Sequence, residues 1–269
     1  MRGQLVIAQH WDEHLDWMKH NWEPGQHIAN VGPTGEGKTT YIVGLLSIRK
    51  YPLALDPKGK DETLAASGWV RVESVPPLGG LPLTPSWWQE RYYHQFKKDG
   101  RTWTDVYDRI AAGERCPVIV GGDARNETED RALVRLMGDG IQFARHSRGW
   151  TLYVDEFELL SSPRMFRLGP PVERMLISAR SAKTSVITSF QAPAWVSKHA
   201  LRQARYAVIY QTGSRAMIKN VAEDMGRDWR ILAAAVDELP QFFCLVVPRG
   251  PRRPMMLVNP PKVSMQLAA

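Results

Sequence analysis

The sequence predicts an α/β fold in which a mostly parallel central sheet is covered by helices on both faces. Apolar, β-branched runs of strand length recur along the 269 residues, and helical patterns lie between them. A glycine-rich loop directly follows the first of these runs and directly precedes a helical one. Hydrophobic residues make up 43% of the chain, enough for a sizeable core, so we expect one large domain with insertions.

The individual elements follow from these patterns in chain order. The expected strands cover residues 28–31, 53–56, 118–121, 150–155, 186–190, 207–211 and 242–247. The expected helices cover residues 39–50, 128–147, 172–179, 214–225 and 229–236. Because the strands are almost continuously apolar, the sheet they form is expected to be buried on both faces.

Residues 1–26 precede the first strand and are expected to form an N-terminal amphipathic arm. Their apolar residues at helical spacing are Trp11, Leu15, Met18 and Trp22. Such a helix would cap the sheet or meet a neighbour. The stretch from His10 to His14 also spells H-x-x-E-H, an inverted zinc-protease pattern. No third ligand is evident, so we favour packing over a metal site.

The main domain is expected to span residues 27–248 and to carry an insertion at 76–115. A proline- and glycine-rich run opens this insertion and is incompatible with a helix or a central strand. Aromatic residues then alternate with cations, a pattern that serves either base stacking or a small satellite core, and we favour the core. Residues 249–269 are rich in proline and basic, and we expect an extended tail.

Charge and cysteine content restrict the partners and the compartment. The net charge of +7 and the pI near 9.5 are compatible with a polyanionic partner. Cys116 and Cys244 both lie in apolar runs, as buried thiols do in a reducing compartment. No apolar segment approaches the ~20 residues of a membrane-spanning helix, and the N-terminus has no signal-length apolar core. We therefore expect a soluble intracellular protein.

The glycine-rich loop has the complete phosphate-binding pattern G-x-x-x-x-G-K-T. With the next residue, the expected nucleotide-binding set is Gly32, Pro33, Thr34, Gly35, Glu36, Gly37, Lys38, Thr39 and Thr40. The glycines let backbone N–H groups turn inward around phosphate oxygens. Lys38 would reach the outer phosphates, and Thr39 would offer its hydroxyl to Mg²⁺ at the first turn of the following helix. The loop thus predicts a site for a nucleoside triphosphate.

A second segment, residues 151–158, is an apolar strand that ends in adjacent carboxylates, as in a Walker B motif. In a phosphate-loop protein the last Asp of this strand lies beside the loop and holds Mg²⁺, and a following Glu polarises the attacking water. Asp155 is therefore the expected metal residue, and Glu156 the expected general base.

Hydrolysis also needs a cation for the charge that develops on the γ-phosphate, and in ring ATPases a neighbouring subunit often supplies it as an arginine. Arg180, just before the strand at 186–190, is the first candidate, followed by Arg174 and Arg148. Gln191 directly follows the same strand. A polar side chain at this strand end could sense the γ-phosphate between the loop and the water.

Four stretches together resemble the FtsK/HerA superfamily of DNA pumps. They are the loop at 32–39, the Asp-Pro-Lys-Gly run at 56–59, the Walker B strand to Glu156, and residues 179–193. The resemblance covers residues 27–225, apart from the insertion. Ala192 stands where the family usually has an arginine. Without membrane helices, the chain is most similar to the compact genome packaging ATPases of tailless, internal-membrane phages with double-stranded DNA.

The resemblance implies a phosphate-loop NTPase of the additional-strand (RecA/FtsK-like) type that uses ATP and Mg²⁺. It further implies a hexameric ring with double-stranded DNA in its channel, capsid or vertex partners, and a place in the host cytoplasm or the virion. The expected function is ATP-driven DNA translocation in viral genome packaging. Candidate contacts to DNA phosphates are Lys58, Lys60, Arg125, Arg131 and the cluster at 91–101.

Two alternatives stay open at this point. One is a DNA pump of the plasmid or conjugation type, which would require a relaxase or a membrane partner. The other is a nucleotide-gated assembly protein that binds ATP and hydrolyses it slowly. Glu156 favours an enzyme over such a switch, because a switch has no need of a general base.

Overall fold

The computed structural model describes residues 6–59, 61–72, 109, 112–122, 127–146, 149–162, 164–191 and 198–261. Nearly all of the expected insertion at 76–115 lies outside these residues. The same holds for Lys60, Arg125, Arg148 and the end of the expected tail, 262–269.

The described residues form a 10-stranded sheet with the order β1-β10-β9-β8-β2-β7-β6-β3-β5-β4. The parallel strands are β2 (His27–Val31), β3 (Pro52–Asp56), β4 (Val70–Val72), β5 (Val118–Gly121), β6 (Thr151–Val154), β7 (Ser185–Phe190) and β8 (Ala204–Tyr210). Three further strands extend one edge, β9 (Cys244–Pro248), β10 (Met255–Val258) and β1 (Val6–Gln9). β9 pairs antiparallel with β8, and β10 pairs antiparallel with β9. All other strand pairs of the described sheet are parallel, so the sheet is mostly parallel.

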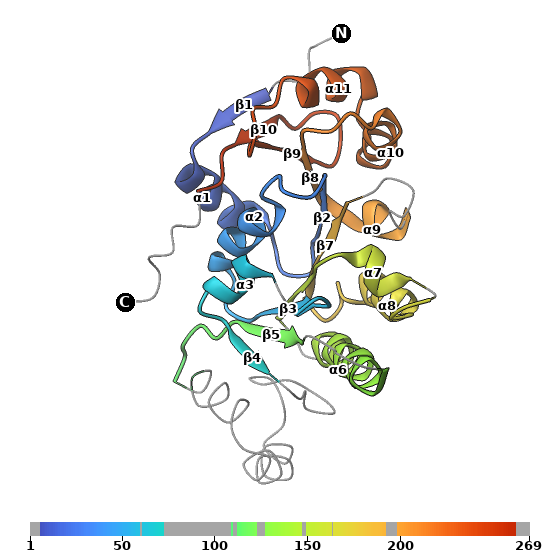
Figure 1. Cartoon of the computed structure of the whole chain (residues 1–269). Coiled ribbons are helices and arrows are strands. Elements are labelled where there is room, and N and C mark those ends of the chain that lie inside the picture. The colour runs from blue at the N-terminus through green and yellow to red at the C-terminus, as the bar shows by residue number, and fades with distance from the viewer. Residues whose placement is uncertain are drawn as a thin grey trace.

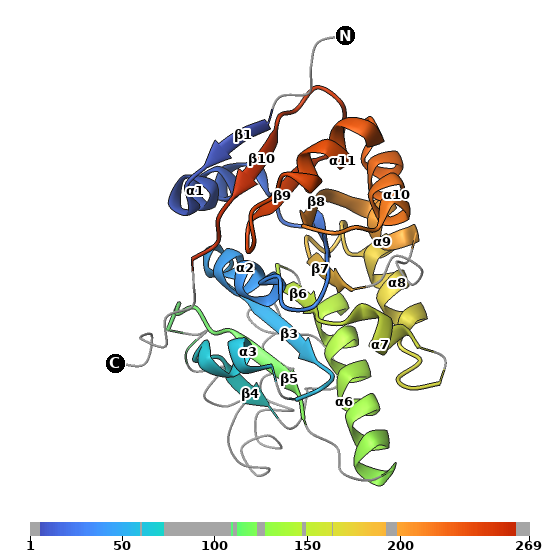
Figure 2. The same ribbon diagram turned by 45° about the horizontal axis from the view of Figure 1, so that its top comes forward.

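Helices cover both faces of this sheet (Figures 1 and 2). On one face lie α1 (Trp11–Asn21), α2 (Lys38–Leu45), the short 3-10 helix η1 (Leu46–Ile48) and α3 (Glu62–Ala66). On the other lie α6 (Glu127–His146), α7 (Phe157–Ser161), α8 (Gly169–Ser178), α9 (Lys198–Gln203), α10 (Arg215–Met225) and α11 (Trp229–Asp237). The sheet therefore divides the hydrophobic core into two layers. In β2, Ile28 packs in the layer with α1, α2 and α3, whereas Ala29 and Val31 pack in the layer on the other face.

The strand order confirms the additional-strand arrangement. β7 lies between β2, which leads into the glycine-rich loop, and β6, which leads into the paired carboxylates. All residues of β2, β6 and β7 are buried, as expected for central parallel strands. The predicted α/β class, with helices on both faces, is thus confirmed.

The two ends of the described chain contribute strands that the sequence analysis did not predict. Residues Val6–Gln9 form an edge strand on Met255–Val258, and that strand turns back on β9 through Gly250, which has a φ of 96°. Both segments therefore complete the sheet. Their four-residue strands are too short for a recognisable alternation, and β1 is largely exposed, so sequence periodicity did not indicate them.

The helix expected in the N-terminal arm is α1, and it packs on the sheet. Its His14 is fully buried, with Nε2 2.9 Å from the Tyr41 hydroxyl and Nδ1 3.1 Å from Oε1 of Gln9. Burial lowers the pKa of His14 to about 4, so the ring is neutral. Across the described residues no group of three or more His, Cys, Asp or Glu side chains is arranged to hold a metal ion. The burial of His14 and its contacts with Tyr41 and Gln9 show that it contributes to packing.

Neither cysteine is exposed. Cys116 and Cys244 are both buried, and burial raises the pKa of the Cys244 thiol. None of the helices in the described part of the chain combines the length and the hydrophobicity that crossing a bilayer requires.

Candidate active site

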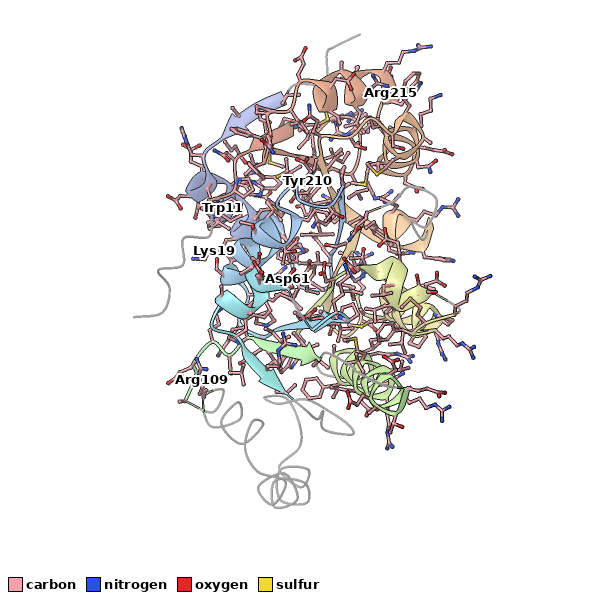
Figure 3. All side chains as sticks on the ribbon, in the orientation of Figure 1. Trp11, Lys19, Asp61, Arg109, Tyr210 and Arg215 are labelled. Atoms are coloured by element: carbon pink, nitrogen blue, oxygen red, sulfur yellow. The ribbon has the colours of Figure 1, made fainter. Side chains whose placement is uncertain are left out.

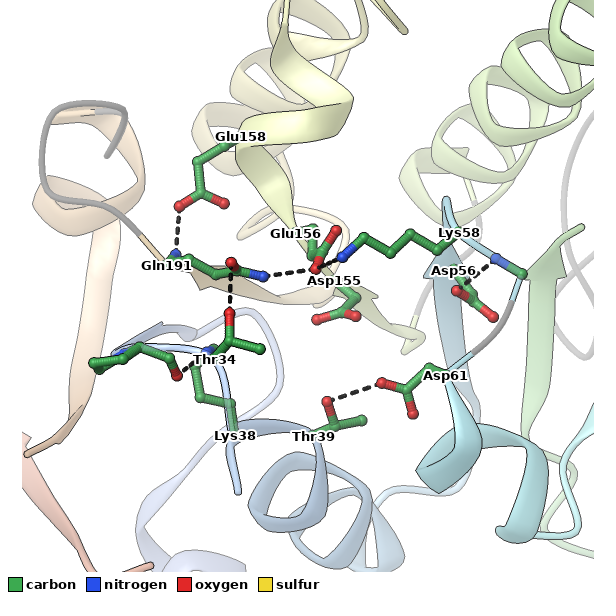
Figure 4. A network of polar contacts seen from close by, with 12 residues as sticks. Thr34, Lys38, Thr39, Asp56, Lys58, Asp61, Asp155, Glu156, Glu158 and Gln191 are labelled. Atoms are coloured by element: carbon green, nitrogen blue, oxygen red, sulfur yellow. Dashed lines mark hydrogen bonds and ion pairs between the residues drawn. The ribbon is translucent and has the colours of Figure 1, made fainter. Parts of the chain in front are cut away.

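The expected site residues, apart from Arg180, come together at the carboxyl ends of the central strands. Strands β2, β3, β6 and β7 are parallel neighbours, and Val31 pairs with Phe190 while Val154 pairs with Thr188. The residues that follow these strands must therefore lie close together at their carboxyl ends. Figure 4 shows the resulting polar network between the loop, the paired carboxylates and Gln191.

The conformation of the loop explains its glycines. Gly37 has a φ of 85° and is the N-cap of α2, which leaves the first N–H groups of the helix without a side-chain acceptor. Gly32 faces Tyr210, a buried side chain in the middle of the molecule (Figure 3), and a Cβ on Gly32 would lie 2.8 Å from that of Tyr210. The loop thus offers open backbone donors at a helix N-terminus, where an anion binds favourably.

Lys38 is buried at the centre of this loop, with only 8% of its surface exposed. Its Nζ donates hydrogen bonds to the carbonyl oxygens of Gly32, at 2.8 Å, and of Pro33, at 2.6 Å. Burial lowers the pKa of Lys38, and the carboxylates of Asp155 and Glu158 act in the opposite direction. The ammonium group is therefore held inside the loop by its carbonyl oxygens.

Asp155 and Thr39 lie on the same cleft, together with an acidic residue that the sequence analysis missed. The Thr39 hydroxyl donates to Oδ2 of Asp61 at 3.1 Å, and Asp61 also caps α3 through the N–H of Leu64. Asp155 accepts a 2.7 Å hydrogen bond from the hydroxyl of Tyr153. Asp61 stands before Glu62 at a helix start, which is a recognisable N-cap pattern, but only the fold brings it to Thr39.

The pKa of Asp155 is raised to about 7. Burial of the carboxyl group is the main cause, and the nearby carboxylates of Asp61, Glu156 and Asp56 raise the pKa further. Asp61 also has a raised pKa, chiefly through burial. A divalent cation would relieve this concentration of negative charge.

These oxygen donors fit Mg²⁺. The ion prefers hydroxyl and carboxylate ligands, and it keeps several waters or substrate phosphates while the protein supplies only one or two carboxylates. Thr39 and Asp155, with Asp61 beside them, form a set of that size.

The raised pKa predicts how stability depends on pH. Because the folded state favours the neutral form of Asp155, its contribution to the free energy of unfolding is fully present below the unfolded pKa of 3.8 and is lost as the pH rises through about 7. We therefore expect metal-free Asp155→Asn protein to gain stability over the wild type as the pH rises from 3.8 to about 7. Urea denaturation of both proteins across this range measures the difference.

Asparagine keeps an oxygen that accepts the hydrogen bond of the Tyr153 hydroxyl, so the variant removes the titrating group with little change in contacts. A stability difference that does not vary with pH would contradict the raised pKa of Asp155.

Gln191 connects the loop with the expected general base. Its Oε1 accepts a 2.8 Å hydrogen bond from the Thr34 hydroxyl, and its Nε2 donates to Oε1 of Glu156 at 2.6 Å. Its backbone N–H donates to the carboxylate of Glu158. Glu156 itself has a φ of 44°, a strained backbone conformation at the N-cap of α7. Gln191 therefore lies between the phosphate-binding loop and Glu156.

Lys58, a candidate for contact with DNA phosphates, lines this cleft. Its Nζ forms an ion pair with Oε1 of Glu156, while 57% of its side chain stays exposed. Arg131, another candidate for DNA contact, is exposed on α6 and pairs with Glu127 at 2.5 Å. The remaining candidates, Lys60, Arg125 and the cluster at 91–101, lie outside the described residues.

Arg180 is not brought to this site. It follows α8 and precedes β7, and its carbonyl oxygen would lie 3.1 Å from a Cβ on Gly25, just before β2. Arg180 therefore lies at the amino ends of the central strands, whereas the cleft lies at their carboxyl ends. The six residues of β7, or roughly 20 Å, separate it from Gln191. Arg180 and Arg174 are both exposed, and Arg148 lies outside the described residues.

The site is a cleft of about 700 Å³, a volume typical of small-molecule sites. Of the expected binding set, Thr34, Gly35, Gly37, Lys38, Thr39 and Thr40 line it. Gly32 and Pro33 contribute the carbonyls that hold Lys38, and Glu36 is half-buried within the loop. Phe242, Pro260 and Pro261, which the sequence analysis did not assign to the site, also line the cleft.

Solved structures similar to this chain were found, although no family model and no curated protein matches it in sequence. The genome packaging NTPase B204 from Sulfolobus turreted icosahedral virus 2, in complex with sulfate, has a TM-score of 0.53 and 14% identity, with 89% of this chain and 98% of that chain covered. The bacterial conjugative coupling protein TrwBdeltaN70 has a TM-score of 0.54 and 14% identity, with 97% and 94% covered.

A third similar structure is the cytoplasmic domain of the type VII secretion ATPase EccC from Thermomonospora curvata, with a TM-score of 0.52, 14% identity, and 90% and 26% covered. B204 has also been solved in complex with AMP and with ATP-gammaS. At these identities the comparisons establish the fold alone, which this chain shares with B204, TrwBdeltaN70 and the EccC domain.

Proposed function

We propose that this protein hydrolyses ATP to move double-stranded DNA, as the genome packaging motor of a virus. The observation that carries the catalytic part is the position of Gln191, hydrogen-bonded both to Thr34 of the phosphate-binding loop and to Glu156. This arrangement connects a nucleotide site with a general base, which a simple binding protein does not need.

The residues of the cleft have distinct roles in this proposal. The N–H groups of the loop and the ammonium of Lys38 bind the β- and γ-phosphates. Thr39 and Asp155 hold Mg²⁺, which when bound neutralises charge on the phosphate oxygens. Thr34 and Gln191 lie where the γ-phosphate binds.

Glu156 acts as the general base. Its carboxylate takes a proton from a water molecule, whose oxygen attacks the γ-phosphorus as the bond to the β–γ bridging oxygen breaks. The products are ADP and inorganic phosphate. Lys58 and Gln191 both donate to Oε1 of Glu156, so their hydrogen bonds orient the carboxylate.

The location of Arg180 supports an active site shared between copies of the chain. Because this arginine lies at the edge of the sheet opposite its own cleft, it could only reach the nucleotide of a neighbouring copy. We propose that copies form a closed, hexameric ring in which each contributes Arg180 to the next.

DNA as the cargo is supported by the net charge of +7 and by the fold. B204, which is matched over 98% of its length, is named a genome packaging NTPase. The cargo would be held through its phosphates and not through base edges, since no groove-reading motif is present in the sequence. Capsid or vertex proteins would then be the further partners.

A DNA-stimulated ATPase assay tests this function. We expect double-stranded DNA of any sequence to raise the rate of ATP hydrolysis, and we expect the stimulation to fall steeply with salt, because phosphate contacts release counterions. A rate that DNA leaves unchanged would favour the slow, nucleotide-gated assembly protein. Stimulation that does not vary with salt would contradict DNA binding through phosphates.

A DNA pump of the conjugation type is the second candidate, because the fold also matches a bacterial conjugative coupling protein over 97% of this chain. The two candidates differ in partner. Pull-down with purified empty capsids of the source virus supports packaging, whereas binding to a relaxase supports conjugation.

A further inference from the structure

Phe242 is an exposed aromatic residue beside the phosphate-binding loop. Its side chain is 44% exposed, although it is large and apolar. The ring lies close to the loop, since a Cβ on Gly37 would be 3.9 Å from Cδ1 of Phe242. Nothing in the hydrolytic network described above uses this residue. An exposed aromatic ring on the wall of the cleft can stack against a flat, apolar group of a ligand.

The backbone of Phe242 is held in an uncommon conformation. Its φ is 67°, in the left-handed region that bulky residues rarely adopt. A turn in which the N–H of Phe243 donates to the carbonyl of Pro240 at 3.1 Å precedes β9 and fixes this geometry. Strained residues of this kind persist where the surrounding structure holds them, often at ligand-binding positions.

The topology of the sheet brings two prolines to the same cleft as this ring. β9 begins with Cys244, which pairs both with Tyr210 at the end of β8 and with Val258 at the end of β10. Phe242 lies just before this part of β9, and Pro260 and Pro261 follow the end of β10. These three residues therefore lie at the same end of the strands as the loop. All three line the cleft.

These three residues lie on the side of the loop away from the hydrolytic residues. In the sheet order, β9 and β10 are on one side of β2, whereas β7, β6 and β3 are on the other. Figures 1 and 2 both show β9 and β10 on one side of α2 and β3 on the other. A nucleotide whose γ-phosphate points to Gln191 and Glu156 must extend its base in the opposite direction, towards Phe242.

We infer that Phe242 is the platform on which the base of the nucleotide stacks, with Pro260 and Pro261 as the apolar walls beside it. The inference rests on the proposed nucleoside triphosphate site and extends it to the base. Aromatic rings stack on any base, because every base has a π-face. The side chains of phenylalanine and proline have no hydrogen-bonding groups, so this subsite holds a base without reading its edge. The protein therefore accepts ATP and GTP alike.

Binding measurements on Phe242 variants test the inference. Calorimetric titration would use the full-length Glu156→Gln protein, which does not consume the ligand, and three ligands: ATP, GTP and inorganic tripolyphosphate, which lacks a base. We expect Phe242→Ala to weaken the binding of ATP and of GTP by roughly 5- to 150-fold each. Tripolyphosphate should bind equally well with and without the substitution.

Two further variants protect the test from a general folding defect. Phe242→Gly removes the ring but is compatible with a positive φ, so it should match Phe242→Ala in its loss of affinity. Phe242→Tyr keeps the ring and should bind as the parent protein does. Trp229→Ala serves as the matched control, because Trp229 is an exposed aromatic residue on α11 that does not line the cleft.

The outcomes separate this inference from the proposed function. ATP affinity that is unchanged in Phe242→Gly overturns the base platform, while binding of tripolyphosphate would still support the phosphate site. A tenfold or greater preference for ATP over GTP that persists in Phe242→Gly also overturns it. Failure of the parent protein to bind either nucleotide or tripolyphosphate would contradict the proposed function itself.

Discussion

Glu156→Gln protein is expected to bind ATP but to hydrolyse it about 100- to 10,000-fold more slowly than the wild type, the range typical for loss of a general base. Glutamine is close in shape to glutamate and retains an oxygen that can accept from Lys58 and Gln191, so binding and fold should be preserved. Steady-state phosphate release measures the rate, and calorimetric titration measures the affinity.

Glu158→Gln is the matched control. Glu158 is also close to the cleft and accepts a hydrogen bond from the N–H of Gln191, but the proposal gives it no proton to transfer. We expect its effect on the rate to be much smaller than that of Glu156→Gln. Equal losses in both variants would contradict the assignment of Glu156 as the base.

The same variant tests whether the site is shared. Arg180→Ala and Glu156→Gln proteins should each hydrolyse ATP only slowly when alone, whereas a mixture should recover part of the activity, because some interfaces then combine an intact Glu156 with an intact Arg180. Recovery depends on the exchange of subunits, which two fluorescent labels can report. Exchange without recovery would place Arg180 outside the active site.

Lys38→Ala should abolish turnover and weaken the binding of ATP by at least about tenfold. Each hydrogen bond to a charged group contributes roughly 1.5–3 kcal/mol, and the Lys38 ammonium would lose its contacts with the outer phosphates. The unliganded protein should unfold at nearly the wild-type temperature. Burial lowers the pKa of Lys38, so removing its charge relieves a desolvation cost that offsets the lost bonds to the loop carbonyls.

Lys50→Ala provides a comparison for this second variant. Lys50 lies beyond the end of α2 and is exposed, with its Nζ 5.3 Å from the centre of the Tyr51 ring. We expect wild-type binding and turnover from it. ATP hydrolysis at the wild-type rate in Lys38→Ala protein would mean that the phosphate-binding loop is not the catalytic site.

The polar network at Gln191 shows which features of the site a local sequence pattern predicts and which it does not. The loop sequence predicted the roles of Lys38 and Thr39, and the structure places both in the cleft. The meeting of Thr34 with Gln191 joins residues 157 positions apart and depends on β7 lying between β2 and β6. Strand composition indicates that a strand is buried, but it does not say which strands become neighbours.

Other residues were missed for related reasons. Asp61 reaches Thr39 only because α3 packs beside α2, and Phe242 reaches the loop only because β9 turns back along β8. The five-residue helices α3 and α7 have too few residues to show a helical period. β1 and β10 are comparably short, and they were interpreted as parts of an arm and a tail.

The sequence by itself determined the α/β class, the phosphate-binding loop, the paired carboxylates and each element with a clear hydrophobic period. These features are encoded by contiguous residues, whose spacing and backbone requirements are local. Only the tertiary structure decided that Gln191 contacts Glu156, that Lys58 lies in the cleft, that Arg180 lies at the far edge of the sheet, and that Phe242 lines the site. Those contacts arise from the order of strands in the sheet, which is set by long-range packing of both helical layers and not by any local stretch of the chain.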